Sequence, residues 1–327
     1  MIFRRTLLAS VACCVMLGSA LATAATTLKA ADNQPVGYPT VVAVENMGKR
    51  IEAGTKGNLK FRMFPGSVLG GEKEMIEQTQ VGAIDILRCS LGPIGPVVPE
   101  VNVFNLPYVF RSVDHMRAVI DGPIGQELLD KVSASSARLI ALAWMDSGAR
   151  SIYTKEPVRK AEDLKGKKLR VQGNPVFVDA LNAMGANAIS MGYGEVFTAL
   201  QTGIIDGAEN NEPSLYTSNH FKAGAKYYTL TRHLIVPEIL LMSKARWDKL
   251  APEEQALIKK EARAAQMEER KLWNETVAED TTKLKAAGVE FIDIDTKQFV
   301  KDTAPVREKY GKDFTDLIKR IDAVQTK

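Results

Sequence analysis

The chain has 327 residues, too many for a small disulfide-stapled domain and enough for two domains that each bury a core. Hydrophobic residues make up 45% and charged residues 25%, which is typical of a soluble globular protein. The 43 Lys and Arg nearly balance the 39 Asp and Glu, and no basic stripe is interleaved with aromatic residues, which argues against a nucleic-acid partner.

The first 24 residues have the pattern of a secretory signal peptide. Arg4 and Arg5 precede an apolar run from Leu7 to Leu17, and the small residues of Ala22-Thr23-Ala24 suit a cleavage site. The apolar run is shorter than the roughly 20 residues that span a bilayer, which argues against a transmembrane anchor. We therefore expect export, with cleavage near Ala24.

Two series of alternating strand and helix patterns follow. The first predicts strands at 27–30, 59–64 and 83–87 and helices at 39–53 and 72–81. This βαβαβ order indicates an α/β domain with a largely parallel sheet. The second series predicts strands at 137–144, 151–153, 168–171, 188–190 and 205–209 and helices at 161–164, 175–184 and 194–202.

The pattern then changes to one long helix, predicted over 252–287. Pro252 suits the first helical position, Glu253 and Glu254 favour a helix N-terminus, and Gly288 can cap the far end. At 1.5 Å per residue such a helix would span roughly 54 Å, which exceeds one small domain. We expect it to cross both domains.

These patterns give a domain organisation. We expect lobe I to comprise 25–149 and 236–251, and lobe II to comprise 150–235. The segment 288–327 is expected to be helical and to lie against the lobes, with strands near 148–152 and 233–240 linking them.

Recognisable catalytic and metal-binding motifs are absent from the sequence. It contains no G-x-S-x-G, no H-E-x-x-H and no phosphate-binding G-x-x-x-x-G-K-[ST]. His115, His220 and His233 have no metal-ligand spacing, so each is expected to be structural or exposed. After cleavage Cys89 is the one remaining cysteine, which excludes an internal disulfide and a Cys-cluster zinc site. We expect no metal and no cofactor.

Polar residues at predicted strand ends and loop tips are the remaining candidates for chemistry. In open α/β sheets, ligands bind beyond the carboxyl ends of the strands. An Arg fork holds a carboxylate through two hydrogen bonds, while amides and hydroxyls give directional bonds to ligand hydroxyls. Such a set suits a small polar anion, and it comprises Asn33, Glu72, Ser90, Arg150, Arg170, Asn174 and the run Glu209-Asn210-Asn211.

The run GKKLRVQGNPVFVDALNAMGANAISMGYGEVFTALQTGIIDGAENN at 166–211 resembles the central signature of TRAP transporter substrate-binding proteins. Further segments do so as well: 64–67 with 69–72, 82–85 and 105–110. The resemblance covers essentially the whole mature chain. It implies a periplasmic, non-enzymatic receptor with a two-lobe fold, a long helix across both lobes, a cleft that closes on an organic acid, and TRAP membrane permease subunits as partners. We expect a monomer.

The resemblance also implies roles for individual residues. Arg170 matches the family arginine that forms a salt bridge with the ligand carboxylate, and Asn210 matches an amide that binds the same group. Arg150 matches a second arginine often found in the cleft. Tyr193 falls where the family places an aromatic residue beneath the ligand.

Other positions have weaker matches. Glu72 is expected to face the cleft, the alternative being a helix-start acid favoured by the dipole. Asn33 and Ser90 are further expected ligand contacts. Three residues at positions that vary within the family either set specificity or are structural, namely Arg88, Asn174 and Trp144.

Glu72 guides the choice of ligand. A carboxylate in the cleft repels a second ligand carboxylate but accepts hydrogen bonds from sugar hydroxyls, which favours a sugar acid such as a hexuronate or aldonate. Arg88, if it reaches the ligand, favours the alternative of a C4-dicarboxylate or a short hydroxy or keto acid. A rival class is an exported hydrolase that uses Ser147 with a distant His, although no motif links that serine to a base.

Overall fold

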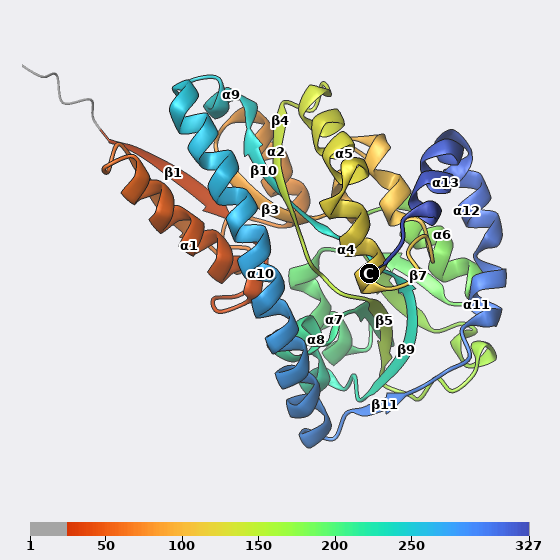
Figure 1. Ribbon diagram of the computed structural model, residues 1–327. Coiled ribbons are helices and arrows are strands. Elements are labelled where there is room, and N and C mark those ends of the chain that lie inside the picture. The colour runs from red at the N-terminus through yellow and green to blue at the C-terminus, as the bar shows by residue number, and fades with distance from the viewer. Residues whose placement is uncertain (1–24, 327) are drawn as a thin grey trace, which may run out of the picture.

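The computed structural model describes residues 25–326, so the expected signal peptide lies outside the described residues. The chain forms two lobes, each built on one β-sheet with helices packed against it, and one long helix runs along both (Figure 1). This arrangement confirms the predicted two-lobe α/β fold. Within the described range, no helix is both long and apolar enough to cross a membrane.

Lobe I contains a five-stranded sheet. In spatial order its strands are β2 (Leu59–Phe64), β1 (Thr26–Ala31), β3 (Ile86–Ser90), β10 (Glu238–Ser243) and β4 (Leu139–Met145). Every residue of β3, β4 and β10 is buried, although β4 is the edge strand of the sheet, because helices pack against it. The helices of this lobe are α1 (Pro39–Gly54), α2 (Glu72–Val81), α3 (Leu91–Ile94), η1 (Pro99–Asn105), α4 (Val113–Asp121), α5 (Pro123–Ala134) and α9 (Lys244–Trp247).

Lobe II contains a six-stranded sheet. In spatial order its strands are β11 (Glu290–Ile292), β9 (Tyr227–Leu234), β5 (Arg150–Thr154), β8 (Gly207–Asn210), β6 (Lys168–Val171) and β7 (Asn187–Ser190). Most of its helices follow strands β5 to β8 in the chain. They are η2 (Ala161–Leu164), α6 (Pro175–Ala183), η3 (Tyr193–Glu195), α7 (Val196–Thr202), α8 (Glu212–Thr217) and η4 (His220–Ala223).

Both sheets are mixed, whereas the sequence pattern predicted a largely parallel sheet. Strand β10 runs antiparallel to β3 and β4, and β5 runs antiparallel to β8 and β9. The path of the chain explains these antiparallel pairs. The chain passes from β4 in lobe I to β5 in lobe II, and it returns from β9 in lobe II to β10 in lobe I. The strand by which it enters each sheet, β5 or β10, runs antiparallel to its neighbours.

Helix α10 (Pro252–Ala286) packs on both lobes. Near its start Ile258, Ala262 and Ala265 join the core of lobe I, and near its end Leu284 joins the core of lobe II. Between them Trp273 covers Gly148, which lies in the first crossing with φ +60; a Cβ there would meet the indole at 3.2 Å. A glycine is therefore required where the crossing passes under the helix.

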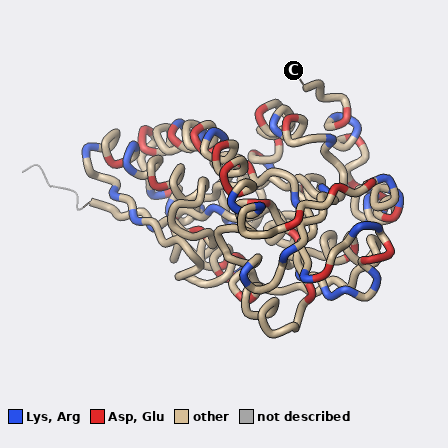
Figure 2. The backbone as a smooth tube through the Cα atoms, turned by 90° about the horizontal axis from the view of Figure 1, so that it is seen from below, with Lys and Arg blue, Asp and Glu red and all other residues tan. Residues whose placement is uncertain are grey.

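After β11, the C-terminal segment is largely helical and contacts both lobes. It contains α11 (Lys297–Asp302), α12 (Ala304–Gly311), η5 (Lys312–Phe314) and α13 (Thr315–Ala323). Lys309 and Tyr310 bond Asp179 of lobe II, while Arg320 pairs with Glu127 of lobe I. Figure 2 shows acidic and basic residues interspersed along the helices, in agreement with the small net charge of +4.

Candidate functional site

A cavity of about 890 Å³ lies between the two lobes, and we call it the inter-lobe cavity. Lobe I contributes wall residues between Ser67 and Val97, and lobe II contributes residues between Arg170 and Glu195. Three predicted residues line it: Glu72 at the start of α2, Arg170 on β6 and Tyr193 at the start of η3.

Arg170 brings a guanidinium with spare donors to this cavity. Its side chain is 3% exposed, and Nε donates to the carbonyl oxygen of Met191 at 2.9 Å. Within residues 25–326, the N–H groups on Nη1 and Nη2 have no hydrogen-bond partner. Burial lowers the pKa of Arg170, while the nearby carboxylates of Glu209 and Glu72 act to raise it. Such a group gains most from an incoming anion, because its charge is dehydrated and its fork is free.

Arg150, in contrast, is engaged within lobe II. Its Nε and Nη2 donate to the two carboxylate oxygens of Glu209 at 2.6 and 2.9 Å, and Nη1 donates to Asn210 Oδ1 at 2.9 Å. Asn210 Oδ1 also accepts the backbone N–H of Asn211 at 3.0 Å. Arg150 thus fixes which way the Asn210 amide points, and the Asn210 Nδ2 group has no partner among the described residues.

Arg88 is engaged in the same way within lobe I. Its Nε donates to Asp32 Oδ2 at 2.9 Å, Nη1 donates to Glu238 Oε2 at 2.8 Å, and Nη2 donates to Asp32 Oδ1 and to Asn33 Oδ1. All four side chains are buried. Arg88 therefore neutralises protein carboxylates and orients the amide of Asn33.

Glu72 connects the two walls of the inter-lobe cavity through Ser90. One carboxylate oxygen, Oε1, accepts the backbone N–H of Ser90 at 2.8 Å, and Ser90 Oγ donates to Gln172 Oε1 of lobe II at 2.9 Å. Burial and the neighbouring charge of Glu238 raise the pKa of Glu72. Its Oε2 has no partner in the described chain, so it can accept a hydrogen bond from a ligand.

Tyr193 forms an aromatic surface beside Arg170. The guanidinium carbon of Arg170 lies 5.6 Å from the centroid of the Tyr193 ring. The Tyr193 hydroxyl bonds Ser218 Oγ at 2.6 Å, and the ring meets His220 edge to face at 5.6 Å. These contacts fix the ring, because both its polar end and one edge are held.

Asn174 and Trp144, whose roles the sequence left open, already form hydrogen bonds within the protein. Asn174 caps α6 by accepting the N–H of Val176, and its Nδ2 donates to the carbonyl of Gly92 at 2.8 Å and to Asn102 Oδ1 at 3.0 Å. Trp144 is fully buried and donates to the carbonyl of Gly125 at 3.0 Å. Asn174 thus joins the lobes, and Trp144 belongs to the core.

A family model for "Bacterial extracellular solute-binding protein, family 7" (DctP) matches residues 30–313. The chain belongs to this family. The match confirms the resemblance to TRAP solute-binding proteins that the motifs at 64–72 and 166–211 indicated.

Two similar proteins are matched over nearly their full length. A solute-binding protein of Chromohalobacter salexigens is 38% identical, over 95% of this chain and 94% of the relative. The crystal structure of a TRAP periplasmic solute-binding protein from Pseudomonas putida F1, with bound D-glucuronate, is 62% identical with a TM-score of 0.91, covering 92% of this chain and 98% of that one.

Two structures of one Citrobacter koseri TRAP solute-binding protein identify the lobe arrangement. The structure with bound D-glucuronate has a TM-score of 0.91 at 52% identity, covering 92% of this chain and 100% of that one. The apo, open structure has a TM-score of 0.81 at 51% identity, covering 90% and 99%. The lobe arrangement of this solute-binding protein is therefore more similar to that of the bound structure than to that of the apo, open structure.

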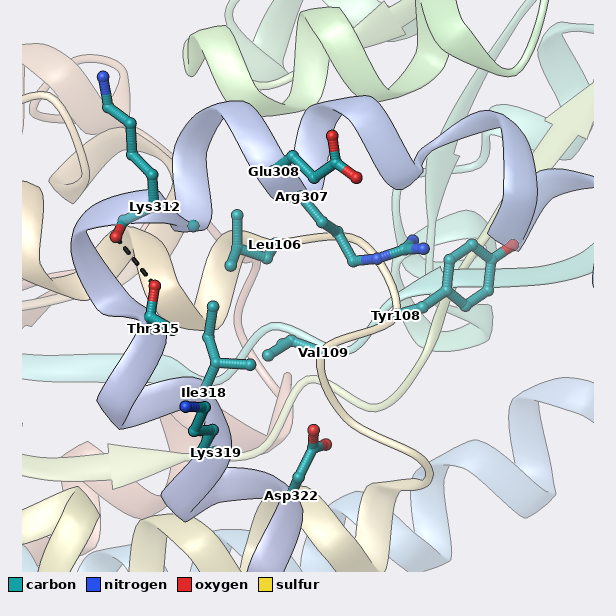
Figure 3. A pocket seen from close by; sticks show the side chains of 11 residues that line it. Leu106, Tyr108, Val109, Arg307, Glu308, Lys312, Thr315, Ile318, Lys319 and Asp322 are labelled. Atoms are coloured by element: carbon teal, nitrogen blue, oxygen red, sulfur yellow. Dashed lines mark hydrogen bonds between the residues drawn. The ribbon is translucent and has the colours of Figure 1, made fainter.

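A second cavity, of about 550 Å³, lies between the 106–109 loop and the C-terminal helices. Figure 3 shows its apolar floor of Leu106, Val109 and Ile318, with Arg307 reaching toward Tyr108. Arg307 is already bound to Thr303 Oγ1 at 2.9 Å and to the Val300 carbonyl at 2.8 Å. This cavity contains none of the predicted residues, so the inter-lobe cavity is the candidate site of this solute-binding protein.

Sequence analysis did not select three residues that shape this site. Gln172 lies two positions after Arg170 and directly follows the end of β6, so extending the strand alternation by one residue could have identified it. Asp32 and Glu238 hold Arg88, but no local pattern identifies Glu238, because it lies 150 positions further along the chain.

Proposed function

We propose that this protein is the receptor of a TRAP-type transporter and that it captures a sugar acid, most simply a hexuronate such as D-glucuronate or D-galacturonate. The observation that carries the proposal is the free fork of Arg170, buried in a cavity that also contains the acceptor Glu72. The family supports the receptor class. The D-glucuronate bound to relatives at 62% and 52% identity supports the uronate.

The chemistry of capture follows from the free donors and acceptors. A ligand carboxylate receives two N–H bonds from Arg170 and one from the Asn210 amide, with the sugar ring against Tyr193. Ligand hydroxyls then donate to Glu72 Oε2 and accept from the Asn33 amide, which Arg88 orients. Arg150 acts by holding Asn210.

The two lobes are proposed to move as separate bodies, comprising 25–149 with 236–251 and 150–235. The crossings at 145–150 and 234–238 and the helix α10 join them. A ligand that contacts both walls favours the closed arrangement in proportion to its extra contacts there. Closure also dehydrates the cavity, which strengthens the bond to Arg170.

We extend the proposal to location and partners. The leader at 1–24 directs export to the periplasm, the mature protein is a monomer, and the loaded, closed form is what the TRAP permease subunits recognise. The protein binds its ligand without changing it.

A C4-dicarboxylate or a short hydroxy or keto acid is the alternative ligand class. It would require a second cationic group with free donors, and Arg88 and Arg150 already face protein carboxylates. A hydrolase would require a base beside Ser147, whose Oγ instead accepts a bond from Asn211 Nδ2 at 3.1 Å. The alternative acids therefore fit less well, and among residues 25–326 no base is hydrogen-bonded to Ser147 Oγ.

The test is calorimetry on the mature protein with D-glucuronate, D-galacturonate, an aldonate, succinate and pyruvate, with the ligand recovered and checked by NMR. We expect saturable binding of at least one sugar acid, at least tenfold tighter than succinate, and unchanged ligand. Thermal unfolding gives a second readout, since a ligand at 100 times its Kd adds about 2.7 kcal/mol to stability. A preference for succinate or pyruvate would overturn the sugar-acid assignment, and product formation would overturn the receptor.

A further inference from the structure

Lobe I has more carboxylates than cations at and behind its wall of the site. Glu72 lines the inter-lobe cavity, and behind it the buried carboxylates of Asp32 and Glu238 pair with one guanidinium, that of Arg88. Asp32 occupies Nε and one N–H of Nη2, Asn33 occupies the other, and Glu238 occupies Nη1. Arg88 therefore has no free pair of N–H groups with which to hold an incoming carboxylate.

Glu238 acts on this wall in two ways. It is the second counter-charge of Arg88, at 2.8 Å, and its negative charge raises the pKa of Glu72 nearby. Its other carboxylate oxygen, Oε1, has no hydrogen-bond partner among residues 25–326. In lobe II, Glu209 neutralises Arg150 similarly, whereas Arg170, which lines the inter-lobe cavity, keeps its Nη1 and Nη2 groups free of partners among residues 25–326.

We propose that Glu238 is a specificity-determining residue that restricts the site to acids with a single carboxylate and excludes diacids of the same length. The inference rests on the proposed function, because it assumes that the first carboxylate binds Arg170. With that group in lobe II, the far end of the ligand meets Glu72 at the lobe I wall, where the charge of Glu238 lies close by. A hydroxyl there finds acceptors, whereas a second carboxylate meets like charges in a dehydrated site.

The test compares two acids that differ at one end. D-Glucuronate and D-glucarate have the same carbon chain, but glucarate has a carboxylate at the carbon that is an aldehyde or hemiacetal in glucuronate. Calorimetry gives Kd for each acid with wild type and Glu238→Gln. We expect the wild type to prefer glucuronate by at least 100-fold. In Glu238→Gln this preference falls at least tenfold, because the change removes a like charge and releases Nη1 of Arg88.

Two control variants separate this effect from damage to the fold. Glu261→Gln removes another buried carboxylate, which pairs with Arg50 at 2.7 Å between α10 and α1 and lies outside the inter-lobe cavity; its preference should equal that of the wild type. Glu238→Asp keeps the charge. If the wild type prefers glucuronate 100-fold, this variant should still prefer it at least tenfold. A structural effect would alter the affinity for both acids alike and leave their ratio unchanged.

The failure of this inference is distinct from failure of the proposed function. A wild type that binds no uronate refutes the proposed ligand. The inference is then judged on the tightest monoacid of the panel and the diacid of the same length. A folded Glu238→Gln protein with the wild-type ratio, or a wild type that prefers the diacid, overturns the role of Glu238.

Discussion

Tyr193 lies against the guanidinium of Arg170, whose central carbon is 5.6 Å from the ring centroid. The two side chains come from different elements, β6 and η3, and both line the inter-lobe cavity. The ring covers one side of the guanidinium, and Met191 holds Nε. The remaining N–H groups are therefore oriented before a ligand arrives, which reduces the ordering that binding requires.

Arg170→Ala is expected to weaken sugar-acid binding by about 2–5 kcal/mol, because a desolvated carboxylate loses its paired donors. Arg170→Lys should restore part of the affinity, since an ammonium supplies the charge without the fork. Calorimetry with D-glucuronate measures both. Arg50→Ala, at an ion pair outside the cavity, serves as the control and should bind as the wild type does. Affinity of Arg170→Ala within a few-fold of wild type would remove Arg170 from the site.

Glu72→Gln is expected to weaken uronate binding about tenfold, roughly the difference between a charged and a neutral acceptor. Succinate affinity should stay constant or rise, because a negative charge leaves the cavity. The bond from the Ser90 backbone to Oε1 can be kept by the Gln carbonyl, so stability should change by about 1 kcal/mol or less. If uronate affinity is unchanged and only stability shifts, Glu72 is a helix-start acid without a ligand contact.

Local patterns predicted the elements that lie within one stretch of chain. The run 168–171 is β6, the run 59–64 is β2, and the helix predicted over 252–287 is α10. Strand β3 begins at Ile86 and not at Ala83, because the backbone N–H groups of Ala83 and Ile84 donate to the Gln78 carbonyl at the end of α2. An apolar pattern does not reveal that these two residues close the preceding helix.

Arrangements that depend on distant chain segments were not predicted. The antiparallel place of β10 follows from a return of the chain between lobes, which hydrophobic periodicity does not encode. The same return brings Glu238 to Arg88, so the sequence left open whether Arg88 faces a ligand. Arg170, Glu72 and Tyr193 were selected together because the family motifs include them, and they line one cavity.

Tyr38→Phe tests the hydrogen bonds that join the closed lobes. Tyr38 OH and Ser214 Oγ are 3.0 Å apart across the lobe boundary, and both side chains are buried. Removing the hydroxyl should destabilise the closed form by about 1 kcal/mol, the typical net contribution of one such bond. Uronate should then dissociate about fivefold faster, with association nearly unchanged. Stopped-flow fluorescence measures both rates.

The control for Tyr38→Phe is Tyr227→Phe, on the first residue of β9 and within lobe II. Its rates should match the wild type. Small-angle scattering of the unliganded proteins adds a second readout, in which Tyr38→Phe has the larger radius of gyration. Equal dissociation rates for all three proteins would mean that the Tyr38–Ser214 bond does not stabilise the closed arrangement.

Two buried histidines predict how stability depends on pH. Burial lowers the pKa of His220 to about 3 and that of His233 to about 4. Each accepts or donates one bond at Nδ1, His220 with Tyr153 OH at 2.8 Å and His233 with Thr231 Oγ1 at 2.9 Å. In the unfolded chain the histidine pKa is about 6.5, so between that value and the folded value the unfolded state binds more protons. Stability therefore falls as the pH falls from 6.5 toward 4.

His220→Gln should reduce by one the number of protons that the protein takes up on unfolding at these pH values. Gln can still accept from the Tyr153 hydroxyl, so the variant remains comparable at pH 7.5. Urea unfolding from pH 7.5 to 4.5 should show its free energy rising relative to wild type by about 1.4 kcal/mol per pH unit below 6.5. Raised carboxyl pKa values, as at Glu72, oppose the loss in both proteins and cancel in this difference. Parallel curves for the two proteins would show that His220 is protonated in the folded state at these pH values.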